Sequence, residues 1–114
     1  MKTMKPMPWT DDELRHCVVA YFAMLSKEIA GEKYSKAEAN RALQQRINRS
    51  RGSIEMKWMN ISAVLAEAGH SYIAGYKPYP NYQAALKTAV MVEVMNEEQR
   101  AAAWQRKLDG CVAS

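Results

Sequence analysis

The sequence predicts an all-α protein, in which a trihelical helix-turn-helix core precedes an aromatic loop and one long or two shorter C-terminal helices. Two observations carry this prediction. Apolar residues recur at spacings of three, four and seven through most of the chain, and Ser, Thr or Gly stands where these stretches begin or end. The 114 residues are expected to form one domain with a modest core. We expect it to comprise residues 1–114, with a flexible tail (1–8), the trihelical core (9–69), the aromatic loop (70–80) and a C-terminal helical segment (81–110).

The composition is that of a soluble globular protein, because hydrophobic residues make up 48% and charged residues 25% of the chain. The two cysteines, Cys17 and Cys111, form neither a CxxC pair nor an obvious disulfide framework, which favours a reducing compartment. The sequence shows no apolar run of signal-peptide or membrane-span length. We therefore expect a cytoplasmic protein with no membrane partner.

The first predicted helix begins at Thr10, where the sequence "TDDE" forms a capping box with Glu13. The early acidic residues also suit the positive end of a helix dipole. Gly31 is placed to end the helix. The apolar stripe expected between these ends comprises Leu14, Cys17, Val18, Tyr21, Phe22, Leu25 and Ile29.

The second predicted helix begins at Ser35, and Glu38 is expected to reach back to it in a second capping box. Its buried stripe is narrow and consists of apolar residues four apart, which are Ala39, Leu43 and Ile47. The other polar side chains of this helix are expected to face solvent or a partner, and they are Lys36, Asn40, Arg41 and Gln44.

Ser50 is expected to cap a third helix, and Gly69 to end it. The buried positions of this helix are Ile54, Trp58, Ile61 and Leu65. Two helices joined by the polar turn "NRSRG" match the outline of a helix-turn-helix. We expect one shared core, with Trp9, Phe22, Trp58, Ile61 and Leu65 as its large members.

The stretch "HSYIAGYKPYP" contains two prolines, a glycine and three tyrosines, which predicts an ordered aromatic loop. Asn81 is placed to cap the helix that follows, and Gly110 is a credible stop. The sequence "NEEQ" at 96–99 either caps a separate fifth helix or forms the polar middle of one long helix. A break near Asn96 is the alternative that we favour. One face of this segment carries Tyr82, Leu86, Ala89 and Val90.

Reactive side chains that could converge on a substrate are scarce, and we expect no catalysis, no metal and no cofactor. His16 and His70 are the only histidines, and each has a structural explanation on or beside a helix. A zinc site needs about three or four ligands at a recognisable spacing, which the chain does not offer. Known phosphate-loop, metalloprotease and nucleophile-elbow motifs are also missing from the sequence.

Positive charge is concentrated in one quarter of the chain. The net charge of the whole chain is +4, yet residues 33–60 alone hold seven basic and two acidic side chains. A solvated helix face normally mixes both signs, so this concentration favours an anionic partner, although small basic patches also arise by chance. The seven are Lys33, Lys36, Arg41, Arg46, Arg49, Arg51 and Lys57.

The predicted start of the third helix, "SRGSIEMKWMNI", combines hydroxyl groups, arginines and free backbone N–H groups. A helix start of this kind is a ready phosphate site. Lys57 and Asn60 are expected on a polar face beside the buried stripe, where they could read base edges. The alternatives are an ordinary helix cap and an ordinary solvated face. A DNA-binding protein should gather its cations on one face, and the predicted DNA-binding residues are Lys36, Arg41, Arg49, Ser50, Arg51, Ser53, Lys57 and Asn60.

Over residues 9–80, the stretches "WTDDEL", "YSKAEANRAL" and "RSRGSIEMKWMNISAVL" resemble a Myb/SANT-like helix-turn-helix domain. They are similar to the amino-terminal DNA-binding modules of HNH-type modification-dependent restriction endonucleases. This resemblance implies a role in contacting double-stranded DNA for the residues from Arg49 to Asn60 named above. The chain departs from the family in having a longer first helix, no tryptophan in the second helix and no HNH nuclease half. It is then a recognition or regulatory component of a restriction or defence system, acting alone or with a separate effector protein.

The competing interpretation is a protein–protein interaction module, such as a small phage- or plasmid-encoded inhibitor of a host system. Eight methionines could supply an adaptable apolar surface. The stretch "AALKTAVMVEVM" is apolar nearly all round, which is more than one half-exposed helix needs. A homodimer through residues 82–108 would bury this surplus and would also suit a DNA-binding protein with paired half-sites.

Overall fold

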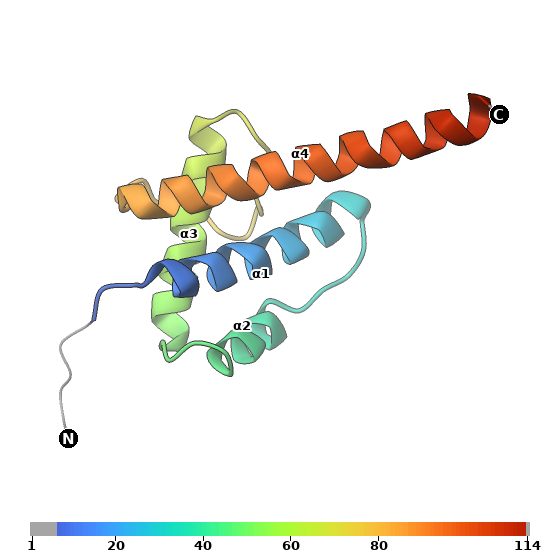
Figure 1. Ribbon diagram of the computed structural model, residues 1–114. Helices are drawn as coiled ribbons and strands as arrows, with labels where there is room; N and C mark the ends of the chain where they lie inside the picture. The colour runs from blue at the N-terminus through green and yellow to red at the C-terminus, as the bar shows by residue number, and fades with distance from the viewer. Residues whose placement is uncertain (1–6, 114) are drawn as a thin grey trace, which may run out of the picture.

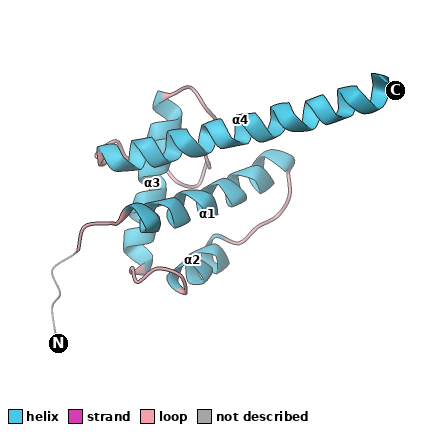
Figure 2. Ribbon diagram, viewed as in Figure 1, coloured by secondary structure: helices cyan, strands magenta, loops and turns pink. Residues whose placement is uncertain are grey.

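The computed structural model describes the backbone of residues 7–113 and the side chains of residues 7–110. These residues form four helices and no strand, as Figure 2 shows, which confirms the predicted all-α fold. The helices are α1 (Asp11–Ala30), α2 (Lys36–Gln44), α3 (Arg51–Glu67) and α4 (Ala84–Ala113). In Figure 1, α3 crosses behind α1 and α4, and α2 lies on the other side of α1 from α4.

The starts of the first three helices follow the predicted caps, except that Glu38 does not reach back to Ser35, so the second predicted capping box is only half formed. Thr10 and Glu13 form the complete capping box of α1, and Gly31 ends that helix in the left-handed conformation with φ of 76°. Only glycine adopts this conformation without a steric cost. The Ser35 and Ser50 side chains each accept a hydrogen bond from a backbone N–H at 3.1 Å, and so cap α2 and α3.

One hydrophobic core joins all four helices. Trp58 is fully buried, and its indole N–H donates to the Cys17 carbonyl at 3.1 Å, which joins α3 to α1. Phe22, Ile61 and Leu65 lie in the same cluster, and Trp9 packs against it half-buried, as predicted. Within the predicted stripe of α1 only Ile29 is wrongly placed. It is 67% exposed, because it lies at the rim of a shallow hollow rather than beneath another helix.

The first half of α4 belongs to this core, which three helices alone do not close. Leu86, Val90 and Val94 are buried in the same cluster as Trp58. The favoured break near Asn96 is wrong, and so is the stop at Gly110, because α4 continues unbroken to Ala113. Asn81 also does not cap α4. The helix begins three residues later, and the Asn81 carbonyl accepts a hydrogen bond from α3 instead.

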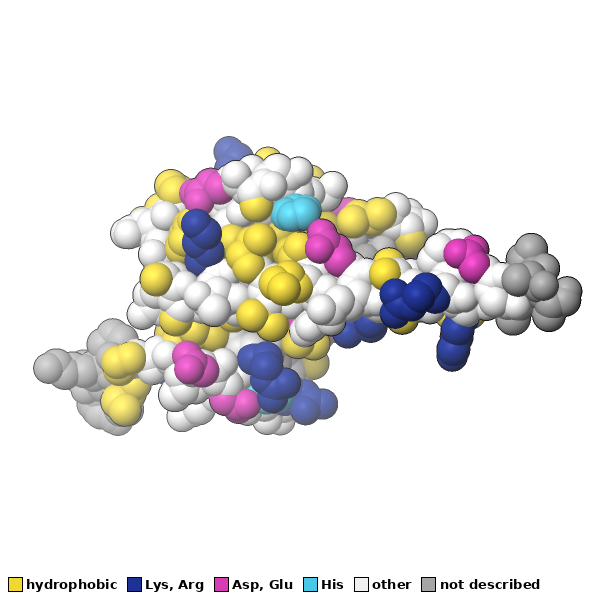
Figure 3. All heavy atoms as spheres, turned by 45° about the horizontal axis from the view of Figure 1, so that its top comes forward, with side chains coloured by type: hydrophobic (Ala, Val, Ile, Leu, Met, Phe, Trp, Pro, Cys, Tyr) yellow, Lys and Arg dark blue, Asp and Glu magenta, His cyan; other side chains and the backbone are white. Residues whose placement is uncertain are grey.

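The second half of α4 extends beyond the core as an isolated arm (Figure 1). The molecule measures 66 × 29 × 24 Å along its principal axes, and this arm accounts for the long one. In Figure 3 the arm stands clear of the body and carries charged side chains of both signs. Trp104, on the arm, is 61% exposed. The arm therefore has no intramolecular packing of its own.

The segment between α3 and α4 is ordered by hydrogen bonds to its neighbours. The backbone N–H of Ile73 donates to the Tyr21 hydroxyl at 2.9 Å, and that of Tyr79 donates to the Met59 carbonyl at 3.1 Å. Ile73 and Tyr76 are also buried in the core. The predicted aromatic loop is therefore ordered and packs against α1 and α3.

Of the helices within residues 7–113, none combines the length and the apolar character that crossing a membrane requires.

Candidate nucleic-acid interface

The start of α3 presents an open helix N-terminus. The Ser50 hydroxyl accepts from the Ser53 backbone N–H and donates to the Ser53 hydroxyl at 3.0 Å. The first backbone N–H groups of a helix have no partner within the helix, and Arg51 and Gly52 occupy these positions. No atom lies within 4 Å of the place where a Cβ of Gly52 would stand. Gly52 therefore faces open space, and the free N–H groups of a helix start can bind an anion.

Arg51 stands beside this N-terminus and remains accessible. Its side chain is 68% exposed, and its Nε lies 3.3 Å from a carboxylate oxygen of Glu55 one turn later. An exposed pair of this kind is weak, about 0.3–0.5 kcal/mol between helix positions i and i+4. The guanidinium can exchange Glu55 for a stronger anionic partner at little cost.

Helix α2 carries two cations, Lys36 and Arg41, and both residues are exposed. The Asn40 side chain donates to the Arg51 carbonyl at 3.2 Å, which holds α2 against α3. Arg41 follows Asn40 directly and is exposed. The ammonium group of Lys36 lies 5.2 Å from the centre of the Tyr76 ring, on a loop that packs against both helices. We call the group formed by Lys36, Arg41, Ser50, Arg51 and Ser53 the α2–α3 surface.

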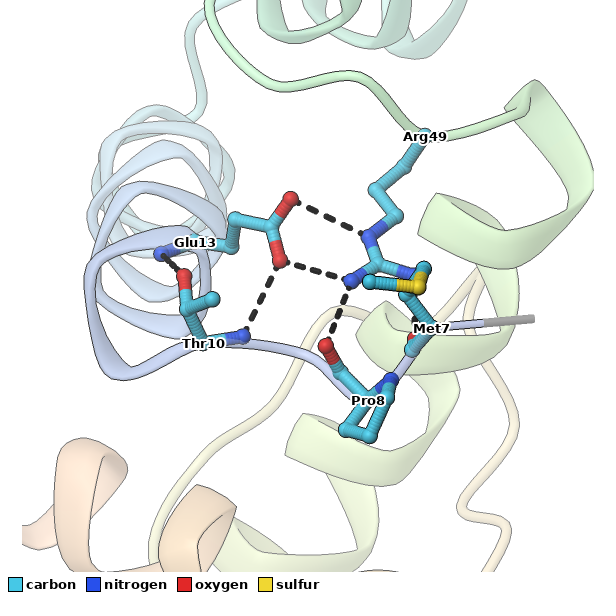
Figure 4. A network of polar contacts seen from close by, with 5 residues as sticks. All are labelled: Met7, Pro8, Thr10, Glu13 and Arg49. Carbon is cyan, nitrogen blue, oxygen red and sulfur yellow. Dashed lines mark hydrogen bonds and ion pairs between the residues drawn. The ribbon is translucent and has the colours of Figure 1, made fainter.

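Arg49, which we expected to hold a phosphate, is instead part of the fold. Figure 4 shows its guanidinium between the Glu13 carboxylate and the chain just before α1. Arg49 donates to both carboxylate oxygens at 2.7 and 3.2 Å, and to the carbonyls of Met7 and Pro8 at 2.7 and 2.8 Å. The side chain is only 11% exposed. The hydrogen bonds from Arg49 lower the pKa of the Glu13 carboxyl group. The prediction of a free Arg49 is corrected, because the N-terminal segment uses all three of its nitrogen atoms.

Lys57 is also drawn to this flank of α3. Its ammonium group lies 5.2 Å from the centre of the Trp9 ring, and the Arg49 guanidinium lies 4.8 Å from the same centre. Burial lowers the pKa of Lys57, and the nearby Arg49 adds to this effect. Two cations on one indole ring are a packing arrangement rather than an accessible base-reading position. The prediction that Lys57 lies nearest the bases is therefore corrected to a half-buried role.

Asn60 is buried, which corrects its predicted position on a solvated face. Its side chain is 3% exposed and donates to the carbonyls of Tyr79 and Asn81 at 2.6 and 3.3 Å. The reason is that the segment between α3 and α4 folds back over this face of α3. Asn60 therefore fastens that segment, and it reaches no base edge without being released from two hydrogen bonds.

Asn40 and Glu28 have structural roles that the sequence did not reveal. Asn40 was expected to face solvent or a partner, but it is 1% exposed and joins α2 to α3. Glu28 accepts hydrogen bonds from the Ala74 backbone N–H at 3.0 Å and from the Tyr34 hydroxyl at 2.5 Å. These bonds lower the pKa of the Glu28 carboxyl group. The only signal in the sequence was a polar residue beside a predicted stripe, which also suits a solvated position.

The described residues offer little reactive chemistry. Among them, no three His, Cys, Asp or Glu side chains come together in a group that could hold a metal ion. Burial raises the pKa of the Cys17 thiol to about 12, so this cysteine stays protonated at neutral pH. The start of α3 presents hydroxyl groups and the exposed Arg51 guanidinium.

We compared the chain with protein-family models, curated proteins and solved structures, and found no match in any of the three. The resemblance to Myb/SANT-like domains therefore stays a prediction from the sequence motifs.

Proposed function

We propose that this chain is a non-catalytic module that binds double-stranded DNA through the α2–α3 surface. One observation carries the proposal. Of the seven cations in residues 33–60, Arg49 and Lys57 lie on the Trp9 ring, Lys36 lies on the Tyr76 ring, and Lys33 and Arg46 line the space between α1 and α2, which leaves Arg41 and Arg51 as exposed cations near the start of α3. The acidic residues of the same segment are Glu38 and Glu55 alone. Excess exposed positive charge beside an open helix N-terminus suits a phosphate backbone.

The contact that we propose is mainly to phosphates. Ser50, Ser53 and the free N–H groups at the start of α3 would receive one phosphate group, with Arg51 and Arg41 on either side. Such contacts position a protein on DNA and carry no sequence information. Because Asn60 is buried, any base reading would be limited to the first exposed turns of α3. A preference for sequence or modification is therefore proposed to be weak in the isolated chain.

Fluorescence anisotropy with a labelled duplex of about 20 base pairs tests this function. We expect binding at low salt. The logarithm of the affinity should fall linearly with the logarithm of the salt concentration, because released counterions drive such binding. An oligonucleotide-sized polyanion that is not DNA, such as a heparin fragment, serves as the control for simple charge attraction. If the wild-type chain shows no duplex binding at low salt, the proposal is wrong.

A role as the recognition or regulatory component of a restriction or defence system follows from the sequence resemblance and is part of the same proposal. The separate effector protein would supply the catalytic activity that the chain itself is proposed to lack. A cytoplasmic location is consistent with this role.

A homodimer through residues 82–108 is a second proposal, and the exposed arm of α4 favours it. Trp104 and Leu108 lie one turn apart on the arm and are 61% and 40% exposed. An isolated helix of this length is marginal in water, so a partner helix would stabilise it. Sedimentation equilibrium should show concentration-dependent dimers that Trp104→Glu removes. A monomer of 12.9 kDa at high micromolar concentration contradicts the dimer.

A further inference from the structure

A groove of about 770 Å³ runs between α1 and α2, away from the α2–α3 surface. Its floor is apolar and is formed by small residues on facing helix stripes. Ala20 and Ala23 line it from α1, and Ala39 and Ala42 line it from α2, with the buried Leu43 beneath. Alanine side chains are too short to fill the space between two helices, so the groove stays open.

Four cations border this apolar floor. Arg15 and Lys27 come from α1, whereas Lys33 and Arg46 lie just before and just after α2. Glu38 is the one carboxylate among the lining residues, and Asp12 nearby lies 3.4 Å from Arg15. Arg15 and Lys27 are separated by about 18 Å along α1, at 1.5 Å per residue. The positive charges therefore stand at both ends of an elongated apolar trough.

The groove and the α2–α3 surface lie on opposite flanks of α2. At 100° per residue, Asn40 stands about 160° around α2 from Ala42 and Glu38, which line the groove, whereas Arg41 lies between these two flanks. Gln44 donates to the Asn40 side chain, which in turn contacts the start of α3. The apolar floor distinguishes the groove from a nucleic-acid site, because phosphates gain nothing from alanine and leucine.

We propose that this groove binds an acidic amphipathic helix of a partner protein. The apolar face of such a helix, with anchors at spacings of three, four and seven, would lie on the alanines and Leu43. Its carboxylates would reach the cations at the two ends of the trough. Charge complementarity selects this occupant, since an acidic helix adds carboxylate partners for Lys27, Lys33 and Arg46, and a basic helix would be repelled by them. The chain would then connect DNA on one flank of α2 to a protein on the other.

A display selection tests the groove without knowledge of the natural partner. Random peptides of about 16 residues, long enough to span the trough as a helix, are selected against the immobilised full-length chain. We expect enrichment of acidic sequences with apolar residues at helical spacing. The enriched peptides are then synthesised with a fluorescent label and should bind the wild-type chain. Ala42→Phe should weaken this binding at least about tenfold, which is the effect of losing one anchor contact.

Matched variants separate the groove from the rest of the molecule. Ala23 and Ala42 are exposed, so Ala23→Phe and Ala42→Phe fill the groove without entering the core. Lys27→Glu should weaken binding of the acidic peptides and leave the melting temperature unchanged. The controls are Ala85→Phe and Lys87→Glu, at exposed positions of α4 outside the groove, which should bind the peptides as the wild type does.

Several results would overturn the groove proposal while leaving DNA binding intact. They are the absence of enrichment, enrichment of neutral or basic peptides, and peptides that bind Ala42→Phe as well as the wild type. If Ala42→Phe weakens duplex binding instead, the groove belongs to the nucleic-acid interface. If Ala42→Phe abolishes self-association, the occupant is a second copy of the chain. The opposite pattern, peptide binding without duplex binding, removes the proposed function and keeps the groove.

Discussion

The two flanks of the α3 N-terminus carry similar side chains and use them differently. On the flank towards α1, Arg49 and Lys57 lie on the Trp9 ring, and Arg49 forms a two-point pair with Glu13. On the flank towards α2, Arg41 and Arg51 stay exposed. We call these the Trp9 flank and the α2 flank. A run of basic residues shows where cations are, whereas distant segments decide which of them can meet a partner.

The largest effect should come from the core beneath both flanks. Trp58→Ala removes a fully buried indole and its hydrogen bond to Cys17, and should reduce the free energy of unfolding by about 3–5 kcal/mol. Chemical denaturation monitored by circular dichroism measures it. Arg51→Ala, on the exposed α2 flank, is the control and should change stability by less than about 0.5 kcal/mol. An unchanged unfolding midpoint for Trp58→Ala would mean that α3 is not the central helix of the core.

Removing Arg49 should test whether the Trp9 flank is structural. Arg49→Ala leaves the Glu13 carboxylate and two backbone carbonyls without their donor. We expect a loss of about 2 kcal/mol, between the values for exposed and for buried ion pairs. Arg49→Lys should recover only part of this loss, because lysine keeps the charge but cannot form the same two-point contact. If Arg49→Ala melts like the wild type, the pair with Glu13 does not hold the helix starts together.

Acid should weaken the Trp9 flank through Glu13, and also the contacts that Glu28 makes with Tyr34 and Ala74. Folding lowers the pKa of Glu13 and of Glu28 from the ordinary value of 4.5. A carboxyl group with a lowered pKa stabilises the fold above its ordinary pKa, and this contribution is lost as the pH falls through the folded value. The melting temperature should therefore be nearly constant down to about pH 5 and fall below it.

Thermal melts of the wild type, Glu13→Gln and Glu28→Gln between neutral pH and about pH 3 measure this dependence. Each variant should be less stable at neutral pH and should show a shallower fall in acid, because one linked carboxyl group is gone. Parallel curves for all three proteins would show that other groups cause the acid sensitivity.

The sequence predicted most of the fold because its elements are determined locally. Capping by Thr10, Ser35 and Ser50 and the apolar stripes of α1 and α3 depend on residues within one or two turns. Helix α4 was less well predicted. The polar residues at 96–99 and Gly110 predicted a break and a stop, but the helix runs unbroken through both positions.

The candidate site was less predictable because its partners are distant in sequence. Asn60 bonds to carbonyls about twenty residues later, and Arg49 bonds to residues before α1. Polar residue types alone do not distinguish a buried hydrogen-bonding role from a solvated face. Arg51 was correctly expected at an exposed helix start, because its surroundings are only the helix turn itself.

The most direct test of the central claim is the salt dependence of duplex binding by matched variants on the two flanks. Each lost phosphate contact should flatten the slope of log affinity against log salt concentration by about 1. Arg41→Ala and Arg51→Ala should therefore flatten the slope, and Arg49→Ala, measured where it is fully folded, should leave it as in the wild type. A slope unchanged by Arg51→Ala, or flattened equally by Arg49→Ala, would contradict the assignment of DNA contacts to the α2 flank.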